Sequence, residues 1–500
     1  MARPTADDPG LPIKLWPCSN GEFVPPPATD VVRETARRAD AEATVTARRL
    51  GLDRRRFLAT LGASALTLLT LDACSNEERK AKGKGDSAGR YPLDESTTTE
   101  PEAAGEALAG DEFILDVQGH LLDYDLDTPE PAGGFWSAFP QSDCGEDDAR
   151  ACFDIEHFLD NMFVKSDNSM VVLSAIPFSS SPSSPLNIDV MEHTRKVVRG
   201  LCGDERILMH GEMSPNGTDP APVLDGMNQM IAEHPLIAWK VYTHSQQGFR
   251  WSLDDHLNES TPYGEAFLRR TVEVGLPVVC VHKGLSGNDP YASPADIGPA
   301  AARHPDITFV VYHSGYEAGN KEGPYDPTVP EPEQQGVDRL LASLDKAGIE
   351  AGANVYAELG STWRTVMGDP DEAAHTIGKL LKRLGPDRIL WGTDSIWYGP
   401  SQDQIEAFRA FEISPEAQEK YGYPALTKEV KAKIFGGNAA RLHKIDIPST
   451  RCTISREQLR SIREVAPAAF RTYGPTTTAG AVTLMKHHGF QIPTAVRTGK

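Results

Sequence analysis

Short apolar runs alternate with longer amphipathic segments between residues 113 and 442. Eight of these runs have the length of a strand and are apolar almost throughout, a pattern typical of strands that are buried on both faces. The predicted strands are Phe113–Val117, Met170–Ala175, Ile207–Met213, Ile237–Tyr242, Val278–His282, Ile307–His313, Val355–Leu359 and Arg388–Gly392.

The segments between these runs have the spacing of helices. Apolar residues recur every three or four positions from Val223 to Ile231, and the segment from Ala266 ends at Gly275, a common helix stop. Eight strands that are each followed by a helix predict an α/β fold, a closed (β/α)8 TIM-like barrel over residues 111–446. An open doubly wound sheet is the alternative, although neither GxGxxG after the first strand nor GxxxxGK[ST] occurs.

The N-terminal region has a different character. Asp53–Leu58 resembles a twin-arginine export signal, and the apolar run Leu61–Leu71 is shorter than the roughly 20 residues that span a bilayer. Residues 1–73 are therefore predicted to be a cleaved twin-arginine-type signal, with a short buried helix as the alternative. This predicts recognition by the twin-arginine export machinery and a location in the cell envelope or periplasm.

Residues 71–74 resemble a lipobox, which implies a lipid anchor at Cys74, although Asp72 departs from the usual residue. Residues 74–110 are polar and are predicted to form a disordered linker. Residues 447–500 form a C-terminal extension that is expected to pack on the barrel or to mediate a homodimer.

Net charge and cysteine spacing limit the classes of binding partner and of structural site that we expect. The net charge of −21 argues against nucleic acid as a partner and leaves a small-molecule substrate as the expectation. No CxxC occurs among the seven cysteines, so a structural zinc ribbon is not expected. Cys144 and Cys152 flank a short polar loop and are candidates for a disulfide after export.

Residues that bind metals or transfer protons stand at the ends of several predicted strands. They are Gln118, His120, His282, His313 and Asp394. In a (β/α)8 barrel these ends meet at one face, where the catalytic groups lie. His120, His282 and Asp394 are candidate ligands of a divalent metal, whose bound water becomes a nucleophile near neutral pH. His313 is the candidate acid and base, and Asp394 is expected to share that role.

These motifs resemble the amidohydrolase-related family, the metal-dependent hydrolase branch that also contains non-oxidative decarboxylases. The resemblance rests on five runs: D-x-Q-x-H (Asp116–His120), VHKG with His282, YHSG with His313, WGTD with Asp394, and KIFGGNAARL (Lys433–Leu442). It implies a barrel with one metal, usually zinc. His120, His282 and Asp394 would be ligands, and His313 the catalytic histidine.

The first-strand motif departs from the family pattern, which has a histidine where this chain has Gln118. An amide oxygen is a weaker and harder ligand than imidazole, so a manganese or magnesium site, or no metal, are alternatives to zinc. Lys240 is expected to be a charge partner inside the barrel. Glu358 and His244 are further strand-end candidates, and His210 is expected to pack.

The sequence thus predicts a metal-dependent hydrolase acting on a small amide, ester or lactone. A non-oxidative decarboxylase (a carboxy-lyase) using the same ligands is the first alternative, because the fold does not decide the chemistry. A non-catalytic ligand-binding barrel with a degenerate metal site is the second. The aromatic residues of Gly133–Pro140 are candidates for a pocket wall.

Overall fold

The structure is a computed structural model of the 500-residue chain. It describes residues 8–85, 88–127, 144, 146–176, 184–213, 219–244, 250–257, 262–286, 289–447, 455–465 and 472–488. The predicted aromatic wall at 133–140 lies outside these residues.

Eight parallel strands form a single sheet in chain order, β2-β3-β4-β5-β6-β7-β8-β9. They are β2 (Leu115–Gly119), β3 (Met170–Leu173), β4 (Ile207–Met213), β5 (Leu236–Tyr242), β6 (Val278–His282), β7 (Thr308–Tyr312), β8 (Val355–Glu358) and β9 (Ile389–Leu390). The sheet closes on itself, because Val117 N donates to Trp391 O at 3.0 Å and Asp394 N donates to Gln118 O at 3.0 Å. The predicted (β/α)8 barrel is confirmed, and the open sheet is excluded.

Asp116 explains part of this closure. Its Oδ1 accepts from Thr393 N at 3.0 Å, and its Oδ2 accepts from Thr393 Oγ1 at 2.5 Å, so the first strand is tied to the segment after the last. The strand interiors are apolar on both faces: Val172, Ala238 and Val310 lie in one buried cluster, and their neighbours in sequence lie in others.

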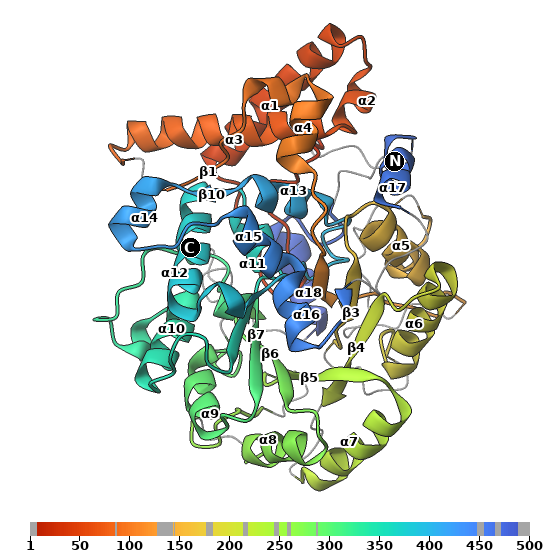
Figure 1. Cartoon of the computed structure of the whole chain (residues 1–500), viewed down its shortest axis with the longest axis vertical. Coiled ribbons are helices and arrows are strands. Elements are labelled where there is room, and N and C mark those ends of the chain that lie inside the picture. Colours follow the sequence, from red (N-terminus) through yellow and green to blue (C-terminus); the bar gives the residue numbers. More distant parts are fainter. Residues whose placement is uncertain are drawn as a thin grey trace.

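Helices surround the barrel (Figure 1). Those of the barrel are α5 (Ile155–Leu159), α6 (Ile188–Cys202), α7 (Ala221–Glu233), α8 (Gly264–Glu273), α9 (Ile297–Arg303), α10 (Val337–Lys346), α11 (Thr362–Val366), α12 (Pro370–Leu384), α13 (Gln402–Ala410), α14 (Pro415–Tyr421), α15 (Lys428–Ala432) and α16 (Asn438–Leu442). The amphipathic spacing that predicted α7 and α8 places their apolar sides toward the sheet, where Met227 and Phe267 are buried.

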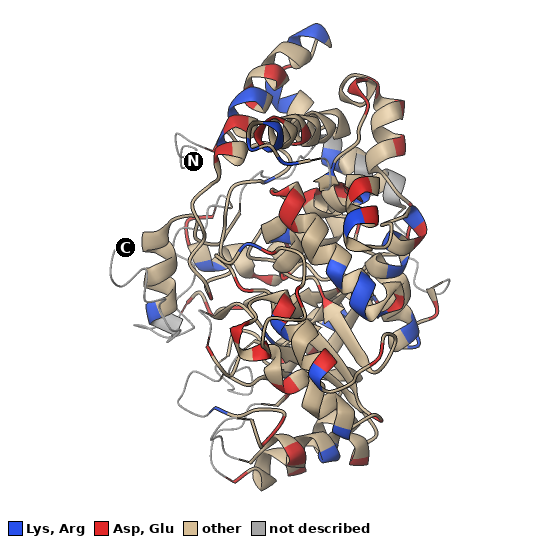
Figure 2. Ribbon diagram, turned by 90° about the vertical axis from the view of Figure 1, so that its left-hand side faces the viewer, with Lys and Arg blue, Asp and Glu red and all other residues tan. Residues whose placement is uncertain are grey.

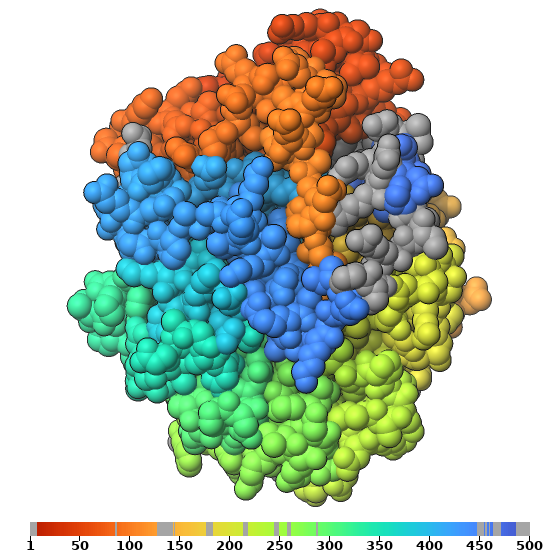
Figure 3. Space-filling view, in the orientation of Figure 1, coloured from red at the N-terminus to blue at the C-terminus, as the bar shows by residue number. Residues whose placement is uncertain are grey.

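The N-terminal region forms a helical layer against the barrel, which we call the N-terminal layer. It contains α1 (Asp30–Arg49), α2 (Arg54–Leu58), α3 (Leu61–Ala81), β1 (Gly89–Arg90) and α4 (Pro101–Leu108). Strand β1 pairs antiparallel with β10 (Glu412–Ile413) of the barrel region. Figure 3 shows this layer, in red and orange, packed directly on the segments near residues 400–430.

The disordered linker predicted over 74–110 is not what the structure shows. The segment carries few apolar side chains, but Tyr91 and Leu108 are fully buried, and the Tyr91 hydroxyl donates to Met367 O at 2.6 Å. The average composition of a segment does not reveal a few buried residues such as Tyr91 and Leu108, which are enough to hold it against the barrel. The apolar run Leu61–Leu71 lies within α3, where Leu68 and Leu71 are buried. This matches the buried helix that was the alternative to an export signal.

No helix among the described residues is long and apolar enough to cross a membrane. Cys144 and Cys152 form a disulfide, as predicted. Lys and Arg are interspersed with Asp and Glu over the molecule (Figure 2).

The C-terminal extension contains α17 (Arg456–Val465) and α18 (Thr478–His488), and it contacts the barrel region where Arg463 pairs with Asp167 at 2.7 Å. Homodimer formation stays a prediction.

Candidate active site at the mouth of the barrel

All five predicted site residues are buried at the carboxyl ends of strands. Gln118 lies in β2 and His120 follows that strand, His282 ends β6, His313 follows β7, and Asp394 follows β9. None is more than 2% exposed. The barrel therefore brings them to one face, which we call the mouth, although their roles stay predictions.

The backbone at the mouth is strained. Residues other than glycine adopt positive φ there, among them Ser286 (48°), His313 (61°), Ser314 (53°), Ser361 (56°) and Asp394 (57°). Each such residue costs on the order of 1–3 kcal/mol, and such strain is concentrated at functional sites. Specific bonds hold the conformation, for example His313 N donating to Glu358 Oε2 at 3.0 Å.

One side of the mouth is built around Asp394, and we call Gln118, His120 and Asp394 the carboxylate side. Gln118 Nε2 donates to Asp394 Oδ1 at 2.8 Å, and His120 Nε2 lies 3.1 Å from the same oxygen. Ser361 Oγ donates to Oδ2 at 2.5 Å, and Asn20 Nδ2 donates to it at 2.9 Å. Burial alone would raise the pKa of Asp394, but the contact with His120 and the nearby His313 lower it to about 2. The carboxylate is therefore ionised at neutral pH.

The opposite side carries three rings, and we call His244, His282 and His313 the imidazole side. His282 Nδ1 lies 3.1 Å from His313 Nε2, and Ser286 Oγ lies 3.0 Å from both His282 Nε2 and His244 Nε2. Burial lowers the pKa of His313 to about 4, that of His244 to about 3 and that of His282 well below 6.5. These rings are neutral at physiological pH, which is the state in which imidazole binds a metal.

Glu22 of the N-terminal region reaches the imidazole side. Its Oε2 lies 3.3 Å from His282 Nε2. Among the described residues, Glu22, His244 and His282 offer three ligand atoms that all lie within 4.8 Å of one another. Burial, followed by the charge of Asp394, raises the pKa of Glu22 to about 8.

The predicted ligand set is thus divided in the structure. His120 and Asp394 are adjacent on one side, whereas His282 belongs to the other side with Glu22 and His244. Gln118 turns its amide nitrogen to Asp394, and its Oε1 has no hydrogen-bond partner among the described residues. Asn20 joins the two sides, because its Nδ2 also lies 3.4 Å from Glu22 Oε2.

Sequence reasoning missed Asn20 and Glu22 and passed over Ser361. No periodicity or motif marks residues 11–23, so only the folded chain reveals that they reach the mouth. His244 and Glu358 were named as strand-end candidates, and both lie there. Glu358 accepts from His313 N and from Gly360 N at 2.5 Å, so it holds the strained backbone in place.

Lys240 is fully buried in β5, and its expected role as a charge partner stays a prediction. Its ammonium sits 3.6 Å from the centre of the Tyr312 ring, and it has no hydrogen-bond partner among the described residues. Burial lowers the pKa of Lys240 to about 8, although Cys280, Glu358 and Asp394 oppose the shift. His210 packs against Tyr312 and Cys280, as expected.

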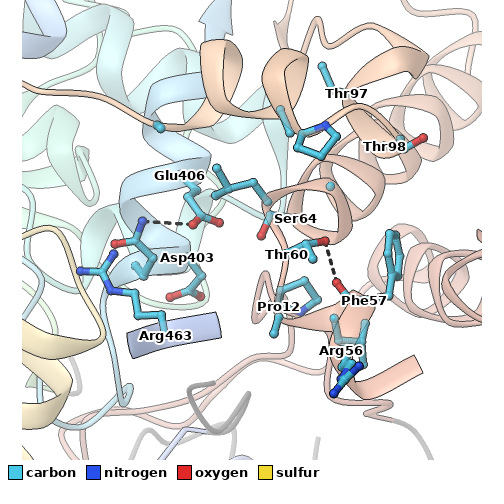
Figure 4. A pocket seen from close by; sticks show the side chains of 18 of the residues that line it. Pro12, Arg56, Phe57, Thr60, Ser64, Thr97, Thr98, Asp403, Glu406 and Arg463 are labelled. Atoms are coloured by element: carbon cyan, nitrogen blue, oxygen red, sulfur yellow. Dashed lines mark hydrogen bonds between the residues drawn. The ribbon is translucent and has the colours of Figure 1, made fainter. Parts of the chain in front are cut away.

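A separate cavity of about 910 Å³ lies between the N-terminal layer and the barrel. Its wall includes Arg56, Phe57 and Ser64 on one side and Asp403 and Glu406 of α13 on the other (Figure 4). None of the site residues described above lines it, so it is distinct from the mouth.

Comparison with known proteins supports an enzyme. The family model described as Amidohydrolase matches residues 215–445. No curated protein matches this chain in sequence.

Many solved structures resemble the chain. The three described next are each under 25% identical with a TM-score below 0.5, so none carries a functional argument. An uncharacterised TIM-barrel protein from Bordetella bronchiseptica is 16% identical, with a TM-score of 0.43, over 66% of this chain and 98% of that one. A 2,6-dihydroxybenzoate decarboxylase from Rhizobium is 15% identical, with a TM-score of 0.38, over 67% and 100%. Amidohydrolase 2 from Bifidobacterium longum subsp. infantis is 14% identical, with a TM-score of 0.27, over 67% and 100%.

The family match covers five of the eight strands and includes His244, His282, His313, Glu358 and Asp394. The protein is an enzyme, and its candidate catalytic groups lie at the mouth of the barrel.

Proposed function

We propose that this protein is a metal-dependent hydrolase of the amidohydrolase type that acts on a small amide, ester or lactone. The observation that carries the proposal is a pair of contacts at the mouth in which a ring nitrogen faces a carboxylate oxygen. One is His120 Nε2 with Asp394 Oδ1 at 3.1 Å, and the other is His282 Nε2 with Glu22 Oε2 at 3.3 Å.

The hydrogen bonds of the rings determine which ring nitrogen carries the proton in these contacts. His120 Nδ1 lies 2.8 Å from Ser174 O, and His313 Nδ1 lies 2.8 Å from Gly360 O. A carbonyl oxygen only accepts, so both Nδ1 atoms carry a proton, and Nε2 of the neutral His313 ring carries a lone pair. His282 Nδ1 then donates to His313 Nε2, which leaves a lone pair on His282 Nε2 as well.

The His282 contact therefore places a ring lone pair opposite a carboxyl oxygen, and it becomes favourable only when a proton or a cation lies between the two atoms. Nitrogen and carboxylate oxygen are the ligands that zinc takes in catalytic sites. The donor set thus fits a divalent metal, with zinc the first expectation and manganese or magnesium the alternatives. When bound, such a metal supplies a water that ionises near neutral pH.

The residues of the chain would then do the remaining work. Asp394 is ionised and held by Ser361 and Gln118, so it can accept a proton from the attacking water without moving. His313 is neutral and oriented by Gly360 O, so its Nε2, which accepts from His282 Nδ1, is the basic atom through which a proton can pass to the leaving group. The burial of both groups excludes bulk water and strengthens these interactions.

A carboxy-lyase is the second candidate, and Lys240 is the observation that favours it. A buried ammonium with no hydrogen-bond partner among the described residues is a ready counter-charge for a substrate carboxylate. Loss of CO2 from such a substrate would require a proton at the carbon that is left, and the transfer of that proton would pass through His313 or Asp394.

The test is elemental analysis of the full chain purified without chelators, followed by a substrate screen. We expect about one divalent metal per chain, lost in His282→Ala, and release of a carboxylic acid from an amide, ester or lactone. Release of CO2 instead would replace the hydrolase with the carboxy-lyase. Tight ligand binding with neither metal nor turnover would overturn both and leave the ligand-binding barrel.

A further inference from the structure

The segment Leu11–Phe23, which we call the strap, lies upstream of the twin-arginine-like residues and reaches the mouth of the barrel. We propose that the strap is a permanent wall of the catalytic centre and that its Glu22 is a metal ligand, so that the working enzyme keeps these residues. This inference rests on the proposed metal-dependent function and adds to it a ligand that the barrel does not supply.

Buried polar contacts fix the strap to the barrel at several points. Lys14 pairs with Asp403 at 3.1 Å, with both side chains at most 7% exposed, and its Nζ donates to Pro400 O at 2.6 Å. Trp16 O accepts from Arg364 at 2.9 Å. Ile13 and Phe23 are buried in the same apolar cluster as the barrel helices. A segment held by buried ion pairs and apolar burial is part of the fold and not a loosely attached leader.

The strap also has an internal structure that presents its polar residues. Ser19 Oγ accepts from Gly21 N at 2.9 Å and donates to Phe23 O at 2.5 Å. Asn20 Oδ1 accepts from Glu22 N at 3.1 Å. These bonds close a tight turn, and the turn directs the Asn20 amide to Asp394 and the Glu22 carboxylate to His282.

Glu22 brings a carboxyl oxygen to the imidazole side, and among the described residues no other acid forms such a group of possible ligand atoms with His244 and His282. Of the acidic groups of the barrel that reach the mouth, Asp394 lies on the carboxylate side and Glu358 is engaged by two backbone N–H groups. A divalent metal on His244 and His282 alone would have only neutral ligands. Glu22 adds a carboxyl oxygen within 4.8 Å of both ring nitrogens, which gives three protein ligands, the number that zinc takes in catalytic sites that keep one position for water.

Removal of the predicted signal would therefore remove part of the site. Cleavage before Cys74 would release the strap, and it would also strip the buried residues of α3 from the layer. Cys74 is itself only 4% exposed, so modification of its thiol would require α3 to unfold. The strap and an N-terminus at Cys74 cannot both belong to the same active chain.

The first experiment measures metal affinity in the full-length protein with Zn²⁺ and, for spectroscopy, Co²⁺ as probes. In Glu22→Gln, which keeps the shape and removes the charge, we expect the Kd for the metal to rise by about 10- to 100-fold or more, as for lost metal-supporting groups. The visible absorption of the Co²⁺ form should change as well, because the ligand set changes. The matched control is Glu42→Gln, an exposed glutamate of α1 in the same N-terminal layer, which should leave the Kd unchanged.

The outcomes separate this inference from the proposed function. No metal in the wild-type chain would overturn the proposed function. Metal bound by Glu22→Gln with unchanged affinity and an unchanged Co²⁺ spectrum would overturn the inference and leave that function standing. Glu22→Asp keeps a carboxylate and should restore part of the affinity, which distinguishes a ligand from a residue needed only for folding.

Intact mass spectrometry of the metal-loaded protein gives a second, independent answer. We expect the mass to include residues 11–23. A metal-loaded, active species whose mass begins at Cys74 would overturn the inference.

Discussion

The two sides of the mouth differ in where their charge comes from. On the carboxylate side the barrel provides the acid itself, and four side chains converge on Asp394. On the imidazole side the barrel provides three neutral rings, and the acid arrives from the strap as Glu22. Under the proposed function, the barrel supplies one part of the catalytic centre and the strap supplies the other.

The largest effect is expected from breaking the carboxylate side. Asp394→Asn keeps the size of the side chain but removes the charge that faces His120 and the acceptor of the proton. We expect kcat/KM to fall by about 10³- to 10⁴-fold, since metal chemistry and general base catalysis each contribute several kcal/mol. The measurement is steady-state kinetics with the substrate from the screen. Asp387→Asn, at an exposed surface pair, is the control, and an Asp394→Asn enzyme with full activity would contradict the role.

A change on the imidazole side separates proton transfer from metal binding. His313→Gln should lower kcat by about 10²- to 10³-fold, in the range of general acid–base catalysis, because no ring nitrogen remains to carry the proton. Metal content should stay near that of the wild type, because His313 faces His282 and not Glu22. Elemental analysis beside kinetics checks both expectations. His375→Gln on α12 is the control, and loss of the metal in His313→Gln would instead place His313 among the ligands.

A buried carboxyl outside the mouth shows, by contrast, how the donors around Asp394 lower its pKa. Glu406 of α13 lines the cavity of Figure 4, and burial raises the pKa of Glu406 to about 7 despite contacts with Ser64 and Gln402. The unfolded chain, with a glutamate pKa of 4.5, loses this proton first, so stability falls as the pH rises from about 4.5 to 7 and levels off above that.

Glu406→Gln removes this loss. We expect the variant to be more stable than the wild type by about 3 kcal/mol at pH 8 and equally stable at pH 4, since each pKa unit corresponds to about 1.4 kcal/mol. Urea unfolding at both pH values is the measurement. Equal stability of the two proteins at pH 8 would show that Glu406 ionises freely in the folded state.

The barrel could be predicted because its signals are local. Strands that are apolar on both faces leave a continuous run in the sequence, and β4 and β6 have the predicted bounds. A ligand-type residue at the end of such a run needs only the barrel geometry to be placed at the mouth. This is why His120, His282, His313 and Asp394 were found.

The strap could not be predicted because its signal is not local. Asn20 and Asp394 are 374 positions apart, and nothing in the residues around Asn20 indicates a partner. The apolar run Leu61–Leu71 further favoured reading everything before it as a leader. The ring and carboxylate pairs within the mouth could not be predicted from the sequence either. They depend on side-chain directions, which the strand pattern does not determine.

The smallest effect, and the sharpest test of the comparison, comes from Gln118. In the structure Gln118 Nε2 donates to Asp394. Its Oε1 lies close to Gly360, because a Cβ added to Gly360 would be only 2.2 Å from this oxygen. Gln118→His places an imidazole, a stronger ligand than an amide, on the carboxylate side. We expect metal affinity to rise by about tenfold, worth about 1.4 kcal/mol, as measured by competition with a chelator. The control Gln118→Asn has a shorter amide and should not gain affinity.

The combination of Gln118→His with Glu22→Gln tells whether the two sides hold one metal. If both residues reach the same ion, a ligand gained on one side compensates for the ligand lost on the other, and the double variant binds more tightly than the two single effects predict. If the sides act separately, the effects of the two substitutions on the binding free energy simply add. An affinity in Gln118→His equal to that of the wild type would mean that position 118 supports Asp394 and is not a ligand position, and the carboxylate side would then act through His120 and Asp394 alone.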